Sequence, residues 1–288
     1  MKAVFRHELS GWFSSVTTYV LGAFLLLFGG IYTMVICLQS QVGNFEYVFA
    51  NMTIIFLFVI PIATMKIIAE EKRQKTDQLL YSMPISMTEV VMGKYLAMLI
   101  VFIIPIAIIL AYPVALSAYG DVYLPAAFSA GLGYFLLGAA LLAIGMFVSS
   151  ISEAQPTAAG LCFVVMLLNY YLTSLTSYVP EDAYASLLAF AVLGLLFALI
   201  VRLMTKSSFA ATVTAVVLEG ALVLLYIFSQ DSFTGLFSKV MGELSLFEQF
   251  YQFVYGIFDL SSVVYLLSVC AVFIFLSVQS MEKRRGSE

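Results

Sequence analysis

The chain has 288 residues, of which 62% are hydrophobic and only 10% are charged, and its mean hydropathy is +1.04. Soluble domains carry about 25% charged residues, so this composition excludes an ordinary soluble domain. The net charge of −4 says little about partners. We expect a lipid bilayer rather than nucleic acid around the chain.

Apolar runs in the sequence repeatedly exceed the roughly 20 residues that cross a hydrocarbon core as a helix. Lipid offers no partner to unpaired backbone groups, so the spans must be helical. The fold class predicted is all-α, a polytopic membrane helical bundle. We expect eight spans, near Val16–Leu38, Asn51–Ile68, Tyr95–Ser117, Leu124–Val148, Thr157–Val179, Tyr184–Met204, Ser208–Ser229 and Leu260–Ser280.

Ahead of the first span, residues 1–15 place several apolar side chains on one helical face, which predicts an interfacial helix with Trp12 at the membrane surface. With both termini in the cytoplasm, every lysine and arginine except Lys239 falls on the cytoplasmic side. This positive-inside distribution predicts that orientation and an even number of spans. Within the third span, Pro105 and Pro113 predict a kink.

The charge of the chain is concentrated between the second and third spans. Seven of the twelve residues from Lys66 to Asp77 are charged. Pro84 interrupts this stretch, and Thr88 and Glu89 begin a new helix, so residues 66–94 predict a short helix across the cytoplasmic face. An ordinary solvated loop would account for the charges equally well. A docking surface for a soluble partner would also account for the helix.

No catalytic motif is visible in the sequence. It contains no phosphate-binding GxxxxGK[ST] loop, HExxH zinc helix or GxSxG elbow. The single histidine, His7, is expected to be solvated at the interface, and the three cysteines show no metal or disulfide spacing. We therefore expect a conduit or scaffold without enzymatic activity, cofactor or metal of its own.

The stretch "AEEKRQKTDQLLYSMPISMTEVVMGKY" closely resembles the segment between the second and third spans of ABC-2 type permeases, the membrane subunits of ATP-binding cassette (ABC) exporters. Lys75 stands where that family often has glycine. "FRHELSGWFSSVTTYV" resembles the family's N-terminal elbow helix, and "FVSSISEAQPTAA" resembles its turn between the fourth and fifth spans. The closing segment resembles the family's last signature, with Gly256, Asp259 and Tyr265 in matching places.

The resemblance implies a type V exporter-like permease in a bacterial cytoplasmic membrane. Two permeases, identical or paralogous, would pair around a central pathway and dock on two copies of an ATP-binding subunit, which holds ATP and Mg. The charged stretch would be the coupling helix. The residues implied at the ATPase interface are Glu70, Glu71, Arg73, Thr76, Asp77, Leu80, Ser82 and Pro84.

Two other functions stay open from the residues alone. An ion-driven secondary transporter would be expected to carry several acids within its spans, and here only Glu219 lies in mid-span. A membrane scaffold or immunity-type protein could use the same fold without transport. A neighbouring ATPase gene or a copurifying ATPase would favour the exporter.

A polar stripe marks the fifth span, with Asn169, Thr173, Thr176 and Ser177 on one helical face beside Tyr170. One interpretation is hydrogen bonding to neighbouring helices, which is common in membranes. The other comes from the resemblance, because the second and fifth spans line the substrate route in the family.

The resemblance does not extend over residues 184–229, which look like an extra two-span hairpin. Glu219 within it should face protein or water, or be protonated. It could bond to this chain, with the Asn169 stripe as one candidate, or recognise an additional membrane subunit. After the hairpin, apolar residues at three- and four-residue steps over 231–258 predict an external amphipathic helix, either continuous or broken in two.

Overall fold

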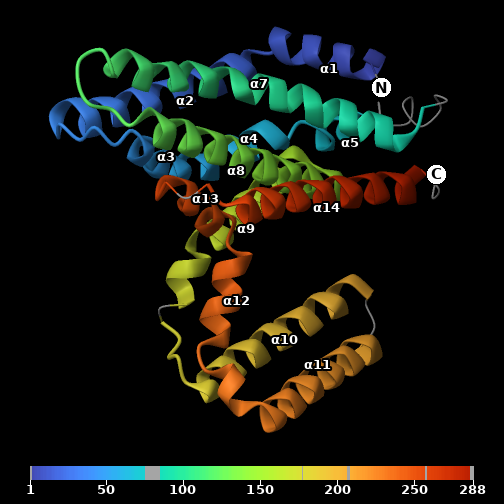
Figure 1. The fold of residues 1–288 in the computed structure, drawn as a ribbon. Helices are drawn as coiled ribbons and strands as arrows, with labels where there is room; N and C mark the ends of the chain where they lie inside the picture. The colour runs from blue at the N-terminus through green and yellow to red at the C-terminus, as the bar shows by residue number, and fades with distance from the viewer. Residues whose placement is uncertain (1, 75–84, 177, 206–207, 257, 286–288) are drawn as a thin grey trace. The chain divides into compact units, whose positions relative to one another are not determined.

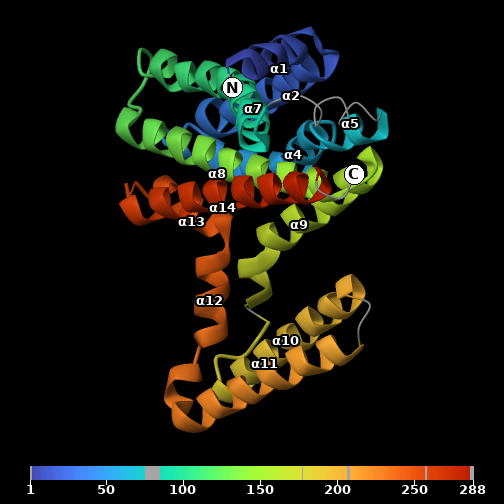
Figure 2. The same cartoon turned by 90° about the vertical axis from the view of Figure 1, so that its right-hand side faces the viewer.

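The computed structural model describes residues 2–74, 85–176, 178–205, 208–256 and 258–285. All secondary structure within these ranges is helical. The chain divides into two compact units, one formed by Met1–Leu168 with Gln249–Glu288 and the other by Asn169–Glu248. Figures 1 and 2 show the helices of each unit in two views.

The first unit begins with α1 (Lys2–Ser14). After Ser15 follows α2 (Val16–Thr33), which continues as one π-helical turn, η1 (Met34–Gln39). α3 (Glu46–Met52), the short η2 (Thr53–Ile55), α4 (Phe56–Thr64) and α5 (Ala69–Gln74) follow. α7 (Met87–Leu116) is one helix that runs through both Pro105 and Pro113. The unit also contains α8 (Leu124–Ile151), the first part of α9 (Gln155–Thr176), the end of α13 (Leu246–Val254) and α14 (Leu260–Arg285).

Six helical stretches of the described residues are long and apolar enough to cross a membrane. They are Val16–Gln39, Glu46–Gln74, Met87–Leu116, Leu124–Ile151, Gln155–Leu172 and Leu260–Arg285. They correspond to six of the eight predicted spans. The other two predicted spans coincide with α10 (Ala183–Thr205) and α11 (Ser208–Phe228), whose described apolar stretches, Ala183–Leu195 and Thr212–Phe228, are shorter.

The core of the first unit is built around α8, which lies between α7 and α14 (Figures 1 and 2) and also contacts α3 and α4. Tyr134 of α8 is fully buried, and its ring stacks on Phe56 with the ring centroids 4.3 Å apart. Phe49 and Phe250 complete this aromatic cluster at 5.3 and 6.1 Å from Tyr134. Such ring pairs add to the packing energy of the buried surface.

Small residues let other helices come close to α8. A Cβ atom added at Gly133 would lie 2.7 Å from the ring of Phe253, and one added at Gly145 would lie 2.5 Å from the Thr64 hydroxyl oxygen. Helix association within membranes depends on such close approach, since lipid supplies no hydrophobic driving force between helices. The glycines of α8 therefore set how tightly the bundle packs.

The second unit contains the predicted hairpin as α10 and α11, which pack against each other. After η3 (Gln230–Phe233), Gly235 turns the chain with a positive φ of 66°, and its N–H donates to the Glu181 carbonyl at 2.8 Å. The predicted amphipathic segment is broken in two, into α12 (Leu236–Leu244) and α13. Ser245 separates them and its hydroxyl accepts from the Glu248 N–H at 3.3 Å, as an N-cap does.

Gly133→Ala should destabilise the first unit by about 1–3 kcal/mol, because the buried Phe253 ring has no room to give way. The matched control is Gly160→Ala in α9, where no atom lies within 4 Å of the added Cβ. Thermal unfolding of the purified protein in detergent measures both. Equal unfolding temperatures for the two variants would contradict the close packing at Gly133.

Candidate functional site

The charged end of the first unit is organised by one buried lysine. The Lys94 ammonium of α7 lies 2.8 Å from the Glu8 carboxylate of α1 and 2.5 Å from the Glu71 carboxylate of α5. Only 2% of the Lys94 side chain is exposed, against 22% of Glu8 and 28% of Glu71. A buried charge is stable only when it is paired, so this ion triad joins three helices at one point.

The glycine beside this lysine explains how the triad forms. Gly93 faces α1, and a Cβ atom there would lie 3.1 Å from a Val4 methyl group and 3.3 Å from the Phe5 backbone nitrogen. α1 therefore approaches α7 closely enough for Glu8 to reach Lys94. The Gly93–Lys94 pair, which carried part of the sequence resemblance, thus has a structural reason.

The prediction that Glu71 faces a partner protein stays untested, but its carboxylate is directed at Lys94, a contact within the chain that the prediction did not include. The prediction placed neighbouring charges on one surface, whereas adjacent helical positions point to different sides. Glu70 and Arg73 do lie outward, 3.9 Å apart, with Arg73 58% exposed, and Gln74 donates to Glu70 at 3.1 Å. The other interface residues proposed from the sequence, Thr76, Asp77, Leu80, Ser82 and Pro84, lie outside the described residues.

A second lysine of the same segment is also buried. The Lys72 ammonium donates to the backbone carbonyl oxygen of Ser150, and to that of Ser152 at 3.3 Å. These carbonyls end α8, where a helix leaves its acceptors unpaired and its dipole favours a cation. Lys72 therefore joins α5 to the end of α8, a role that sequence reasoning missed when it counted this lysine among solvated charges.

Ser149 strengthens the same attachment. Its hydroxyl oxygen accepts from the backbone N–H groups of Ile68, at 3.3 Å, and Ala69, at 3.1 Å, where α5 begins. The serines of "FVSSIS" had been identified only as part of a turn, although Ser and Thr commonly satisfy free N–H groups at helix starts. α5 is thus held directly by α7 and α8, and Lys94 links it to Glu8 of α1.

A cleft of about 470 Å³ opens beside α5, between α1, the start of α2 and the end of α4. Trp12 and His7 line one side, and Lys66 and Glu70 line the other. Lys66 donates to the Thr17 hydroxyl at 3.0 Å. The cleft therefore presents both signs of charge next to the segment 66–94.

Gly256 and Asp259, which match the family's last signature, have local structural roles. Gly256 has a positive φ of 76°, which a glycine adopts without strain. Asp259 caps α14, accepting from the Ser261 N–H at 3.0 Å and the Ser262 hydroxyl at 3.2 Å. The Ser261 N–H, followed by the Ser262 hydroxyl, holds the pKa of Asp259 below its usual value.

In the second unit, Asn169 connects α9 to the break between α12 and α13. Its amide donates to the Leu244 carbonyl at 3.4 Å and accepts from the Leu246 N–H at 3.1 Å. Tyr170 packs edge-on against Phe247, with the ring centroids 5.0 Å apart. These contacts fit the helix-bonding interpretation of the polar stripe. Thr173 and Thr176 lie in α9 without described side chains, and Ser177 lies outside the described residues.

Glu219 lies against a glycine of the neighbouring helix. A Cβ atom at Gly194 of α10 would be 2.7 Å from one Glu219 carboxylate oxygen, which is buried and makes no hydrogen bond. The nitrogen of the Asn169 side-chain amide donates to Leu244, and its oxygen accepts from Leu246. Among the described residues, the Asn169 amide is thus bonded to the α12–α13 junction, and the suggestion that the Asn169 stripe holds Glu219 stays a prediction.

The helices and a match to a known family identify the class of this protein. A helical bundle with six apolar stretches of spanning length, and with charge gathered at one end, defines a multi-pass membrane protein. Residues 30–281, more than half of the chain, match the family described as ABC-2 family transporter protein, and the chain belongs to that family. The matched range includes the hairpin and begins after α1. A comparison with curated proteins finds no match.

Replacing Lys94 should be strongly destabilising, because Glu8 and Glu71 would then face each other without a cation. We expect Lys94→Met to cost about 3–5 kcal/mol. Arg73→Gln is the control, since its exposed pair with Glu70 contributes at most about 1 kcal/mol. Unfolding in detergent measures both, and a Lys94→Met protein as stable as Arg73→Gln would contradict a structural triad.

Proposed function

We propose that this chain is the permease subunit of an ABC exporter and that α5 transmits movement from a separate ATP-binding subunit. The observation that supports this most is the attachment of α5 to α7 and α8, with α7 bonded in turn to α1. Glu71 bonds to Lys94 of α7, Lys94 bonds to Glu8 of α1, and Lys72 bonds to the end of α8. A solvated loop needs none of these bonds.

The exposure pattern of α5 fits a docking helix. Ala69 and Lys72 are buried against the bundle, while Glu70 and Arg73 point outward with opposite charges. Complementary charges at the edge of an interface chiefly select the partner and its orientation. A push on this outer face would reach α7 and α8 directly, because the inner face is bonded to both.

The proposed assembly follows from the family and from the arrangement of the ends. α5, the N-terminus of α1 and the C-terminal end of α14 lie at one end of the first unit (Figures 1 and 2). This end carries the charged segment, so we propose that it is cytoplasmic in a bacterial membrane. Two permeases, identical or paralogous, would pair and bind two ATP-binding subunits. These subunits would hold ATP and Mg. An additional membrane subunit could bind at the hairpin.

The outward charges provide a direct test of coupling. Reversing both with Glu70→Lys and Arg73→Glu should lower permease-stimulated ATP hydrolysis roughly tenfold, equivalent to about 1.4 kcal/mol, while the unfolding temperature is unchanged. The control reverses two exposed charges of α14 with Glu282→Lys and Arg285→Glu. The measurement uses the permease reconstituted with its ATP-binding subunit.

Two results would oppose the proposal. Stimulation that is unchanged in the Glu70/Arg73 reversal would remove α5 from the interface. Substrate movement that persists without ATP but collapses with the ion gradient would instead indicate a secondary transporter. A permease that neither binds an ATP-binding subunit nor moves substrate would indicate a scaffold.

We also propose that the outer half of α9 lines the substrate pathway through Thr173 and Thr176. Each would be replaced by cysteine after Cys37, Cys162 and Cys270 are changed to alanine. A membrane-impermeant thiol reagent should label both positions in a nucleotide-dependent way, whereas a cysteine at Leu161 of the same helix should stay unlabelled. If Thr173 and Thr176 resist labelling in every nucleotide state, the pathway lies elsewhere.

A further inference from the structure

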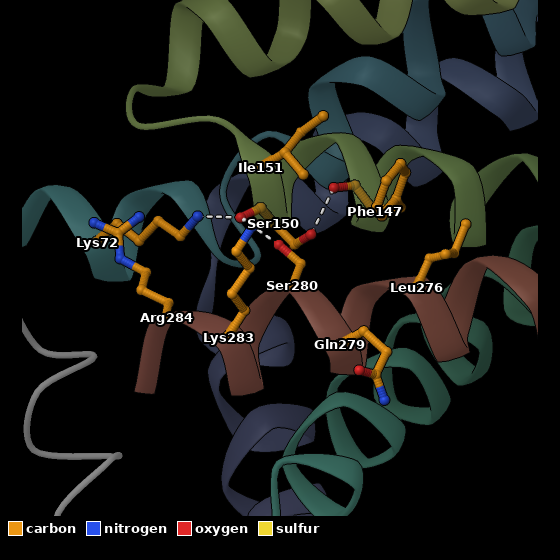
Figure 3. Close-up of a pocket in the computed structure, with 9 residues that line it drawn as sticks. All are labelled: Lys72, Phe147, Ser150, Ile151, Leu276, Gln279, Ser280, Lys283 and Arg284. Carbon is orange, nitrogen blue, oxygen red and sulfur yellow. Dashed lines mark hydrogen bonds between the residues drawn. The ribbon is translucent and has the colours of Figure 1, made fainter. Parts of the chain in front are cut away.

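A groove of about 940 Å³ lies between the ends of α5, α8 and α14, and none of the three residues of the Lys94 triad lines it (Figure 3). Lys72, Lys283 and Arg284 contribute three positive charges to its wall, and none of the described residues that line it is acidic. In the close-up, the Lys72 and Lys283 side chains converge on Ser150 from different helices. Lys72 and Ser150 of this groove also join α5 to α8, whereas Lys283 and Arg284 have no part in the coupling described above.

The groove is apolar at its other end. There Leu276 of α14 is 36% exposed and Phe147 of α8 lies beside it, whereas Ile151 lies next to Ser150 at the charged end (Figure 3). Leu276 precedes Lys283 by seven residues on α14, which separates the apolar and charged ends by about 10 Å along the helix. Gln279 and Ser280 lie between them and offer hydrogen-bonding groups.

The charged end and the apolar end of the groove correspond to the headgroup and the acyl chain of a phospholipid. The charges close the end of a membrane-spanning helix, where a lipid headgroup lies, and the apolar residues continue toward the hydrocarbon. Basic pockets between helices at the membrane surface are suited to anionic headgroups. We propose that the groove binds an anionic glycerophospholipid, with its phosphate at Lys283 and Arg284 and its acyl chain against Leu276 and Phe147.

Lys72 and Ser280 make the charged end a built site rather than a patch of surface cations. Lys72 is 8% exposed and is bonded to the end of α8, and Ser280 donates to the same Ser150 carbonyl at 3.4 Å. The ammonium is therefore fixed in the wall. A phosphate at Lys283 and Arg284 would gain from this fixed charge without displacing it.

The test is a lipid titration of the delipidated full-length protein, followed by native mass spectrometry. Phosphatidylglycerol should bind more tightly than phosphatidylcholine. Lys283→Gln with Arg284→Gln should weaken phosphatidylglycerol binding roughly thirtyfold, the combined effect of two basic side chains near an anionic surface. Arg6→Gln with Arg285→Gln is the matched control, since these exposed arginines do not line the groove, and it should bind as the wild type does.

Two further variants keep the test decisive if the glutamine pair folds poorly. Lys283→Arg with Arg284→Lys retains both charges and should retain binding. Leu276→Trp fills the apolar end without changing any charge and should weaken binding of the whole lipid but not of glycerol phosphate.

Four outcomes would overturn the proposal. They are equal binding of phosphatidylcholine, unchanged binding by the glutamine pair, displacement of the lipid by millimolar inorganic phosphate, and a groove crosslinked through Lys283 to an acidic segment of a partner protein instead of lipid.

Discussion

The junction of α1, α5 and α7 in the first unit depends on the buried ammonium group of Lys94. Lys94 is surrounded by protein, so its charge must be balanced within the fold, and Glu8 and Glu71 balance it from two other helices. An ion pair of this kind adds less to stability than apolar packing would, but breaking it is costly. Because breaking the ion triad is costly, the triad fixes the positions of α1 and α5 along α7. It also explains why a mostly apolar chain has charges at this one place.

The attachment of α5 continues into the core through α8. Lys72 and Ser149 join α5 to the last turn of this helix, whereas Tyr134 and Gly133 pack its other half against α4 and α13. A displacement of α5 would thus be carried by one closely packed helix rather than by a loop. The proposed coupling function and the packing of the bundle therefore share the same residues, and the lipid groove lies at the same end of α8.

The sequence predicted the features that depend on local pattern. Long apolar runs predicted eight spans, of which six are helices of spanning length. Thr88 and Glu89 predicted the start of α7, which begins at Met87. The amphipathic segment predicted a helix that could be continuous or broken in two, and it is broken at Ser245. Contacts between residues that are far apart in the sequence could not be predicted. Glu8 meets Lys94 across 86 positions and Lys72 meets Ser150 across 78, so neither partner lies within the range of a helical pattern. The same limit applies to the contact of Glu71 with Lys94 and to Asn169, whose partners follow more than 70 residues later.

The central claim is that α5 and α7 move as one body during the ATP cycle. Spin labels at Arg73 of α5 and Thr88 of α7, both exposed, measure this within a single doubly labelled permease in the reconstituted complex. The distance distribution should be the same in the nucleotide-free and ATP-bound states, and should broaden when Lys94 is replaced by methionine. A shift of more than about 5 Å, one helical turn, between the two states of the wild-type complex would contradict the claim.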